Sequence, residues 1–213
     1  MLIIVVKLLL AYLIGSISGS LILGRMRGVD IRTQGSGNAG GTNAFRTQGA
    51  GFALGVVAID IGKGALATAL VYFGPPVLGV STLALAFAAG IACAVGHIWP
   101  VFFGFRGGKG AAVWVGVLAV ALPWAIAPLV GLWLLVLVAT GWVGLATIVA
   151  GAALPPVVWV LSGDMHALWL ASAMGALIVY THRANLARLR HGTEPRFEGA
   201  RFWRRWGRAG RSR

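Results

Sequence analysis

Three polar motifs in this chain combine glycine with hydroxyl, amide and basic side chains, the groups from which proteins build phosphate sites. The first motif is Gly35-Ser-Gly-Asn-Ala-Gly-Gly-Thr-Asn-Ala-Phe-Arg46. Its glycines allow backbone N–H groups to approach an anion, its hydroxyls and amides add neutral donors, and a guanidinium fits phosphate geometry. We interpret the motif as an anion site, against the alternative of a flexible polar loop. The predicted contacts are Ser36, Asn38, Thr42, Asn43 and Arg46.

The second motif is Phe105-Arg-Gly-Gly-Lys-Gly110, preceded by His97. It resembles a phosphate-cradling glycine loop but not a Walker A motif, which requires Ser or Thr after the lysine. Lys109 stands just before an apolar segment, so the N-terminal N–H groups and dipole of a helix would add to its attraction for an anion. The alternative is an interfacial turn, and His97 either donates in the site or caps the segment before it. The predicted contacts are His97, Gly107, Gly108, Lys109 and Gly110.

The third motif places His182, Asn185 and Arg188 three residues apart. On a helix, residues three or four apart lie on a common face, so these side chains are predicted to point into one site. The alternative is a basic segment that binds anionic lipid headgroups. We favour this alternative for residues 196–213 and the site for His182 and Asn185.

Asp60 and Lys63 are two charges inside an otherwise apolar stretch. Charged residues inside a membrane span are costly and usually pair or face the bundle interior. We therefore predict an interior Asp60–Lys63 pair behind the site, and a direct catalytic role for Asp60 is the less favoured alternative.

The amino-acid composition indicates which class of protein carries these motifs. Hydrophobic residues make up 58% of the 213 residues and charged residues only 11%, whereas soluble domains carry roughly 25% charged residues. The chain is therefore expected to be an all-α integral membrane protein. Its net charge of +13 favours anionic lipids or an anionic substrate, and nucleic acid is disfavoured because the basic residues flank apolar spans. The single cysteine, Cys93, lies in an apolar run and indicates no disulfide.

About seven membrane spans are predicted, each needing about 20 mostly apolar residues. The stretch from Gly110 to Gly163 lacks Asp, Glu, Lys and Arg and fits either two tilted spans or three short ones, of which we choose three. Residues 25–49 are expected to form a loop. The N-terminal stretch is expected to be a retained span rather than a cleaved signal, because no basic region precedes it. The predicted spans are 2–24, 50–73, 79–98, 111–122, 124–140, 144–161 and 165–181.

The distribution of Lys and Arg sets the expected orientation. Basic residues gather at 25–49, at 99–110 and after residue 182. With seven spans and the N-terminus outside, all three regions lie in the cytoplasm, as the positive-inside bias requires. Six spans would place the basic tail on the opposite face. We therefore predict a transmembrane domain over 1–196, a basic cytoplasmic tail over 197–213, and one polar site on the cytoplasmic face.

Together these motifs resemble those of the bacterial acyl-phosphate:glycerol-3-phosphate acyltransferases, membrane enzymes that begin phospholipid synthesis. The resemblance covers residues 1 to about 196. It is carried by Ser36–Asn43 with Arg46, Asp60 with Lys63, Gly96-His97 with Gly107–Gly110, and His182, Asn185, Arg188 and Gly192-Thr-Glu194. Two features depart from it. Thr181 stands where the third motif usually has Arg, so that any phosphate contact from that arginine is either lost or moved, with Arg183 as the alternative. The tail is also longer and more basic.

The resemblance implies seven helices and transfer of a fatty acyl group from acyl phosphate to the 1-hydroxyl of glycerol-3-phosphate, without a metal or another cofactor. It implies catalytic roles for Ser36, Arg46, Lys109 and His182. The substrate-binding residues are then Asn38, Thr42, Asn43, His97, Gly107, Gly108, Gly110, Asn185 and Arg188. The implied partners are both substrates, membrane lipids and the soluble enzyme that supplies acyl phosphate, and the implied location is the bacterial inner membrane.

Two questions stay open at this point. Either His182 or the leaving phosphate takes the proton of the attacking hydroxyl. A membrane carrier for an organic phosphate is the rival class of function, although a carrier would be expected to show polar groups on both membrane faces, and here they gather on one.

Overall fold

The computed structural model describes residues 1–200, and the secondary structure within this range consists of helices without strands. Five helical segments are long and apolar enough to cross a membrane, and two further apolar helices are shorter. The predicted all-α membrane class is therefore confirmed. Residues 201–213, which make up most of the predicted basic tail, lie outside the described residues.

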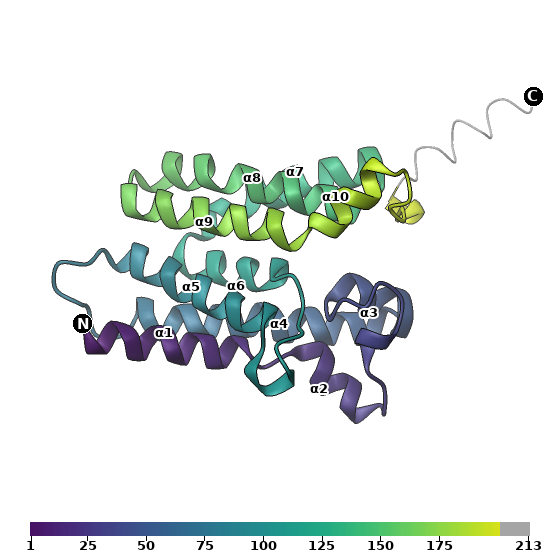
Figure 1. Cartoon of the computed structure of the whole chain (residues 1–213). Coiled ribbons are helices and arrows are strands. Elements are labelled where there is room, and N and C mark those ends of the chain that lie inside the picture. The colour runs from purple at the N-terminus through teal and green to yellow at the C-terminus, as the bar shows by residue number, and fades with distance from the viewer. Residues whose placement is uncertain (201–213) are drawn as a thin grey trace, which may run out of the picture.

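The helices form two groups that lie side by side (Figure 1). The first group contains α1 (Leu2–Gly15), α2 (Gly19–Met26), α3 (Gly41–Gln48), α4 (Ala50–Tyr72), α5 (Thr82–Ile98) and α6 (Ala111–Ala121). The second contains α7 (Ile126–Thr140), α8 (Val143–Ser162), α9 (Met165–Thr181) and α10 (Arg183–Arg190). Short 3-10 turns occur at Ile31–Thr33, Val101–Phe103, Pro123–Ala125 and Glu198–Ala200.

The uncharged stretch after Gly110 forms three helices, α6, α7 and α8, which agrees with three short segments rather than two tilted ones. Leu122 and the 3-10 turn at Pro123–Ala125 separate the first two. Gly141, in the left-handed conformation at φ 79°, ends α7. The breaks therefore fall where proline and glycine interrupt helical hydrogen bonding.

The first predicted span, 2–24, corresponds to the apolar segment Leu2–Met26, within which residues 16–18 separate α1 from α2. One expectation needs correction. Residues 25–49 are not only a loop, because α3 occupies Gly41–Gln48. This polar helix has an apolar side at Ala44, which is buried against Val56 and neighbouring residues of α4. Tertiary packing, rather than helix propensity, explains why it forms.

Ser81 and Asp164 connect the two groups at the end away from the polar motifs. The Ser81 hydroxyl donates to Asp164 Oδ2 at 2.5 Å, and Asp164 Oδ1 accepts the N–H groups of His166 and Ala167 at the start of α9. This joint ties the beginning of α5 to the beginning of α9.

Small residues bring α4 and α6 into close contact, as is common between membrane helices. A side chain at Gly116 of α6 would overlap the backbone of Ile61 and Ala65 in α4. A backbone clash cannot be relieved by a change of rotamer. The close approach of these helices therefore depends on glycine.

We expect Gly116→Ala to lower the thermal stability of the detergent-solubilised protein by several degrees, because overpacking typically costs about 1–3 kcal/mol. The matched control is Gly131→Ala on α7, where an added methyl group meets no atom within 4 Å. Cys93 is the single cysteine and is buried, so labelling by a thiol-reactive dye during heating reports unfolding. Equal melting temperatures for the two variants would contradict the close contact.

Candidate functional site

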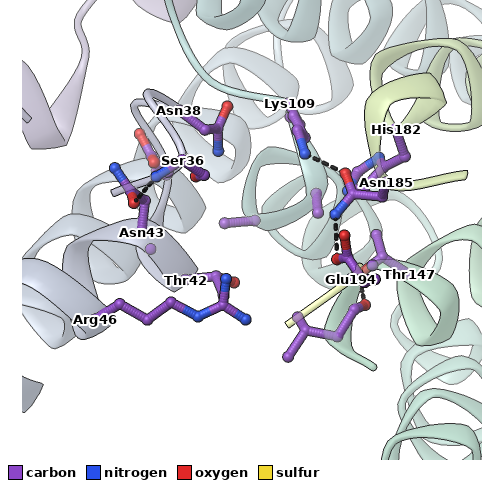
Figure 2. Close-up of a pocket in the computed structure, with 18 of the residues that line it drawn as sticks. Ser36, Asn38, Thr42, Asn43, Arg46, Lys109, Thr147, His182, Asn185 and Glu194 are labelled. Atoms are coloured by element: carbon purple, nitrogen blue, oxygen red, sulfur yellow. Dashed lines mark hydrogen bonds between the residues drawn. The ribbon is translucent and has the colours of Figure 1, made fainter. Parts of the chain in front are cut away.

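A polar cavity of about 100 Å³ lies where the three motifs meet. Figure 2 shows Ser36, Asn38 and Arg46 on one side of it, with Lys109, His182 and Asn185 on the other. Eleven of the thirteen predicted site residues line the cavity. They are Ser36, Asn38, Thr42, Asn43, Arg46, His97, Lys109, Gly110, His182, Asn185 and Arg188.

Asn43 holds the first motif in shape from behind. Its side-chain amide donates to the carbonyl oxygens of Ile31 and Gln34 at 3.1 and 3.0 Å, and its Oδ1 accepts the N–H of Ser36 at 2.9 Å. Both amide protons are thus used within the protein, and the residue is only 1% exposed. Asn43 therefore positions Ser36 and also lines the cavity, where its contact with substrate stays a prediction.

The helices α3 and α6 both begin at the cavity. Gly40 precedes α3, Gly110 precedes α6, and both line the cavity together with the residues that follow them. Gly110 has φ 87°, a left-handed conformation that favours glycine. The first N–H groups of a helix lack intrahelical acceptors, so both helix ends offer donors and a positive dipole end to an anion.

A chain of hydrogen bonds connects the second and third motifs. Lys109 Nζ donates to Asn185 Oδ1, and Asn185 Nδ2 donates to Glu194 Oε1 at 2.6 Å. Arg188 Nε donates to Glu194 Oε2 at 2.7 Å. Figure 2 shows the bonds through Asn185. The buried Glu194 carboxylate thus fixes both Asn185 and Arg188, and both residues present the rest of their side chains to the cavity.

We did not assign Glu194 or Thr147 to the site from the sequence, yet both line the cavity. Glu194 is an acidic residue in a region dominated by arginine, and this contrast could have identified it as a partner of a site residue. Thr147 lies in the apolar helix α8 and bonds Val143 O at 2.9 Å, so nothing in its sequence context distinguished it.

Cations outnumber carboxylates around the cavity. Arg46, Lys109 and Arg188 line it, together with the carboxylates of Asp60 and Glu194. The pKa of Lys109 falls to about 8, first because burial disfavours the ammonium and then because of the nearby positive charge of Arg188. Because the Arg188 charge adds to the effect of burial on Lys109, an anionic ligand would relieve the repulsion between the two cations.

His182 is a neutral hydrogen-bonding group at pH 7. Burial, with a further effect of the Lys109 charge, lowers its pKa to about 4. Nδ1 lies 2.8 Å from Ile178 O, and a carbonyl only accepts, so the single ring proton belongs on Nδ1. Nε2 is then unprotonated and acts as a hydrogen-bond acceptor.

Gly107 and Gly108 do not line the cavity. The N–H of Gly107 donates to Ile98 O at 3.0 Å and that of Gly108 to His97 O at 3.1 Å, so neither is free to cradle a phosphate as predicted. A side chain at Gly108 would collide with the His97 ring. These glycines allow the loop to lie against the end of α5.

Arg183 does not replace the arginine that is absent at Thr181. Its guanidinium stacks over the Tyr180 ring at 4.3 Å and donates to Tyr180 O, and it does not line the cavity. Thr181 Oγ1 instead lies 3.1 and 3.0 Å from the carbonyl oxygens of Lys109 and Ile178, which share its single hydroxyl proton. Thr181 therefore supports the backbone at Lys109 from the second helix group.

The predicted interior pair is present and includes a third residue. Lys63 Nζ lies 3.0 Å from Asp60 Oδ1 and 2.7 Å from His97 Nδ1, and it also donates to Ile17 O at 2.8 Å. Asp60 and His97 line the cavity, whereas Lys63 lies behind them. His97 is therefore joined to this pair.

An apolar groove of about 660 Å³ adjoins the polar cavity. It runs between α4 and α6 on one side and α7 and α8 on the other, and it shares Gly41, Thr42, Ala111, Ala112, Val143 and Thr147 with the cavity. Leu54 and Val130 line the groove and are 70% and 38% exposed. The groove therefore opens sideways from the helix bundle.

The segment after α10 borders both spaces. Pro195 O accepts from Arg46 at 3.4 Å, and Phe197 N donates to Gly141 O at 2.7 Å. The Phe197 ring packs edge-on against Phe45 of α3 and lines the groove. The folded region thus extends past residue 196, where we had predicted the tail to begin.

Comparison with known proteins finds close relatives over nearly the whole chain. The family model described as glycerol-3-phosphate acyltransferase matches residues 5–192. The glycerol-3-phosphate acyltransferase of Chlorobaculum parvum is 40% identical, with 87% of this chain and 93% of the relative aligned. That of Clostridioides difficile is 39% identical, with 86% and 90% aligned.

Two solved structures have the same fold. The glycerol 3-phosphate form of PlsY, an integral membrane glycerol 3-phosphate acyltransferase, matches with a TM-score of 0.82 and 34% identity, covering 91% of this chain and 95% of PlsY. Its lysophosphatidic acid form matches with a TM-score of 0.82 and 33% identity, covering 93% and 98%.

Proposed function

Because the chain belongs to the glycerol-3-phosphate acyltransferase family, we propose that it acylates the 1-hydroxyl of sn-glycerol-3-phosphate with acyl phosphate as the donor. The products are 1-acyl-glycerol-3-phosphate and inorganic phosphate. This proposal names the donor and the acylated position, which go beyond the family description.

The observation that carries the proposal is the junction between a cationic cavity and an apolar groove. Six residues line both spaces. A fatty acyl phosphate has the matching shape, with an anionic head and an apolar chain joined at the reactive carbonyl. Its carbonyl carbon would lie at the junction, beside the cavity that receives glycerol-3-phosphate.

The chemistry requires charge neutralisation and positioning rather than a covalent nucleophile. Arg46, Lys109 and Arg188 offset the charge of two phosphate groups, and the N-terminus of α6 adds N–H donors. Phosphate is already a good leaving group. Holding the hydroxyl against the acyl carbon is worth up to roughly 7–11 kcal/mol in well-oriented systems, and donors directed at the developing oxyanion add to it.

We propose that the leaving phosphate, rather than His182, takes the hydroxyl proton. A group with a pKa of about 4 is a weaker base than a phosphate with a second pKa of about 6. His182 Nε2 accepts a hydrogen bond from the hydroxyl and orients it. The C–O bond to glycerol forms, the acyl–phosphate bond breaks, and the proton leaves with the phosphate.

We also propose that the cavity faces the cytoplasm of a bacterial inner membrane. The loops that build it carry the basic residues, which the positive-inside bias assigns to that side. Glycerol-3-phosphate then arrives from water and the acyl chain from the bilayer, through the lateral opening of the groove. Membrane lipids and a soluble enzyme that produces acyl phosphate are the proposed partners.

The test is phosphate release by the pure protein in detergent or lipid mesophase. We expect turnover with long-chain acyl phosphate only when glycerol-3-phosphate is present, and little with acyl-coenzyme A, because the described residues contain no nucleotide-binding fold. Added inorganic phosphate is expected to inhibit, since it competes for the same cations.

Two results would contradict the donor assignment: robust turnover of acyl-coenzyme A, or insensitivity to inorganic phosphate. A carrier of organic phosphates would instead move glycerol-3-phosphate across sealed vesicles without consuming acyl phosphate. Measuring transport and phosphate release on the same preparation separates the two functions.

A further inference from the structure

Asp60 is a carboxylate in a cavity otherwise suited to anions. It lies on α4, is 2% exposed and lines the polar cavity. A carboxylate repels a phosphate dianion because both are negatively charged, and neither has a proton to donate in a hydrogen bond. Asp60 is therefore not expected to bind the phosphate group of a ligand. It is suited to accept a hydrogen bond from a hydroxyl group elsewhere in the ligand.

The hydrogen-bonding capacity of the other acidic residue in the cavity is occupied, whereas that of Asp60 is not. Glu194 accepts Asn185 Nδ2 and Arg188 Nε, one on each oxygen. Asp60 Oδ1 is buried and ion-paired with Lys63 Nζ at 3.0 Å, with His97 Nδ1 at 3.4 Å, so it faces the protein interior. Among the described residues no group donates a hydrogen bond to the other oxygen, Oδ2. A buried acceptor of this kind normally has a partner.

His97 does not compete with Asp60 for a ligand hydroxyl proton. Its Nδ1 lies 2.7 Å from Lys63 Nζ and accepts that N–H, so Nε2 carries the ring proton. The Nε2 side of the ring lies against Gly108, where an added side chain would collide with it. Lys63 meanwhile balances the charge of Asp60 from behind the cavity wall.

The position of Asp60 indicates which hydroxyl it meets. Its neighbours Val57 and Ile61 line the apolar groove, but Asp60 lines only the cavity. The 1-hydroxyl must face the acyl carbon at the junction with the groove. The other hydroxyl of the acceptor, on C2, is the one left for the cavity wall.

We propose that Asp60 accepts a hydrogen bond from the C2 hydroxyl of glycerol-3-phosphate and so selects this acceptor over phosphates that lack the hydroxyl. The inference rests on the proposed function of the same site. It makes Asp60 a residue that determines acceptor specificity, held in place by Lys63.

The experiment compares two acceptors on the same preparation: sn-glycerol-3-phosphate and 3-hydroxypropyl phosphate, which lacks only the C2 hydroxyl. The wild-type protein is expected to favour glycerol-3-phosphate at least tenfold in kcat/KM, because a site built to bond a hydroxyl discriminates against the analogue without it. In Asp60→Ala the ratio should fall towards one, mainly through loss of activity on glycerol-3-phosphate. Asp60→Asn, of the same shape, should give an intermediate ratio.

The ratio of the two kcat/KM values does not depend on the fraction of active protein, so partial misfolding of a variant cannot mimic the effect. The matched control is Thr68→Val, which alters another buried polar residue of α4 that does not line the cavity. Its ratio should equal that of the wild type.

Equal use of both acceptors by the wild-type protein would overturn the role of Asp60, and this measurement needs no variant. An unchanged preference in Asp60→Ala would overturn it as well. Failure of the wild-type protein to acylate either acceptor would instead overturn the proposed function, and this inference with it.

Discussion

Lys109→Ala should reduce kcat/KM for glycerol-3-phosphate by about ten- to a hundredfold, because it removes a half-buried cation that lines the cavity. A hydrogen bond to a charged group is worth about 1.5–3 kcal/mol, and each 1.4 kcal/mol corresponds to a factor of ten. Lys109 also donates to Asn185, so its loss disturbs the third motif as well. Phosphate release measured over a range of glycerol-3-phosphate concentrations tests this.

Lys7→Ala is the matched control. Lys7 Nζ donates to Pro75 O, and neither residue lines the cavity. It should retain near wild-type kcat/KM. Equal losses in the two variants would mean that the effect arises from general destabilisation rather than from the lost phosphate contact.

The pH profile gives an independent check on the same residue. The pKa of Lys109 is about 8, so the ammonium is charged below that pH and loses its proton above it. Because kcat/KM reports ionisations of the free enzyme, it should fall as pH rises through about 8. Lys109→Arg keeps its charge at all these pH values, so this fall should disappear even if its absolute activity is lower.

The meeting of the three motifs was predictable from the sequence because charge and topology act together. Basic residues favour one membrane face, and the span count brings residues 35–46, 104–110 and 182–188 to it. The Asp60–Lys63 pair was predictable because residues three apart share a helix face. The resemblance to the acyltransferase family indicated the order of the motifs along the chain, but not the distances between their side chains.

Other features could not be predicted because they depend on contacts between distant segments. α3 forms in a polar stretch because Ala44 packs against α4. Gly107 and Gly108 looked like a phosphate cradle, but whether an N–H is free depends on the nearby carbonyl oxygens of His97 and Ile98. Asn43 and Glu194 were equally ambiguous, because an amide or carboxylate serves either a ligand or another side chain.

The sequence indicated that an apolar binding surface should exist, but it did not indicate which residues form it. The family resemblance implied a fatty acyl substrate and hence an apolar binding surface, but every apolar helix residue is equally suited to lipid, to a neighbouring helix or to a groove. Only the arrangement of the two helix groups distinguishes Ala150, which lines the groove, from Ala152, which is exposed on another side of α8.

Substitutions at Ala150 and Ala152 test whether the groove holds the acyl chain. Ala150 lies one turn beyond Thr147, which lines both cavity and groove. Ala150→Trp should therefore fill the groove just past the junction and exclude the distal part of a long acyl chain. We expect at least a thirtyfold loss of kcat/KM for palmitoyl phosphate, because each buried methylene contributes about 0.8 kcal/mol and losing three removes about 2.4 kcal/mol.

Butyryl phosphate should be turned over about equally by Ala150→Trp and the wild-type protein, since its chain ends before the obstruction. Ala152→Trp introduces the same side chain on the exposed side of α8 and should leave the preference for chain length unchanged. A uniform loss across all chain lengths in Ala150→Trp would point to misfolding or a damaged cavity. Unchanged activity with palmitoyl phosphate would show that the acyl chain lies outside this groove, because no long chain can share the space with an indole ring at its entrance.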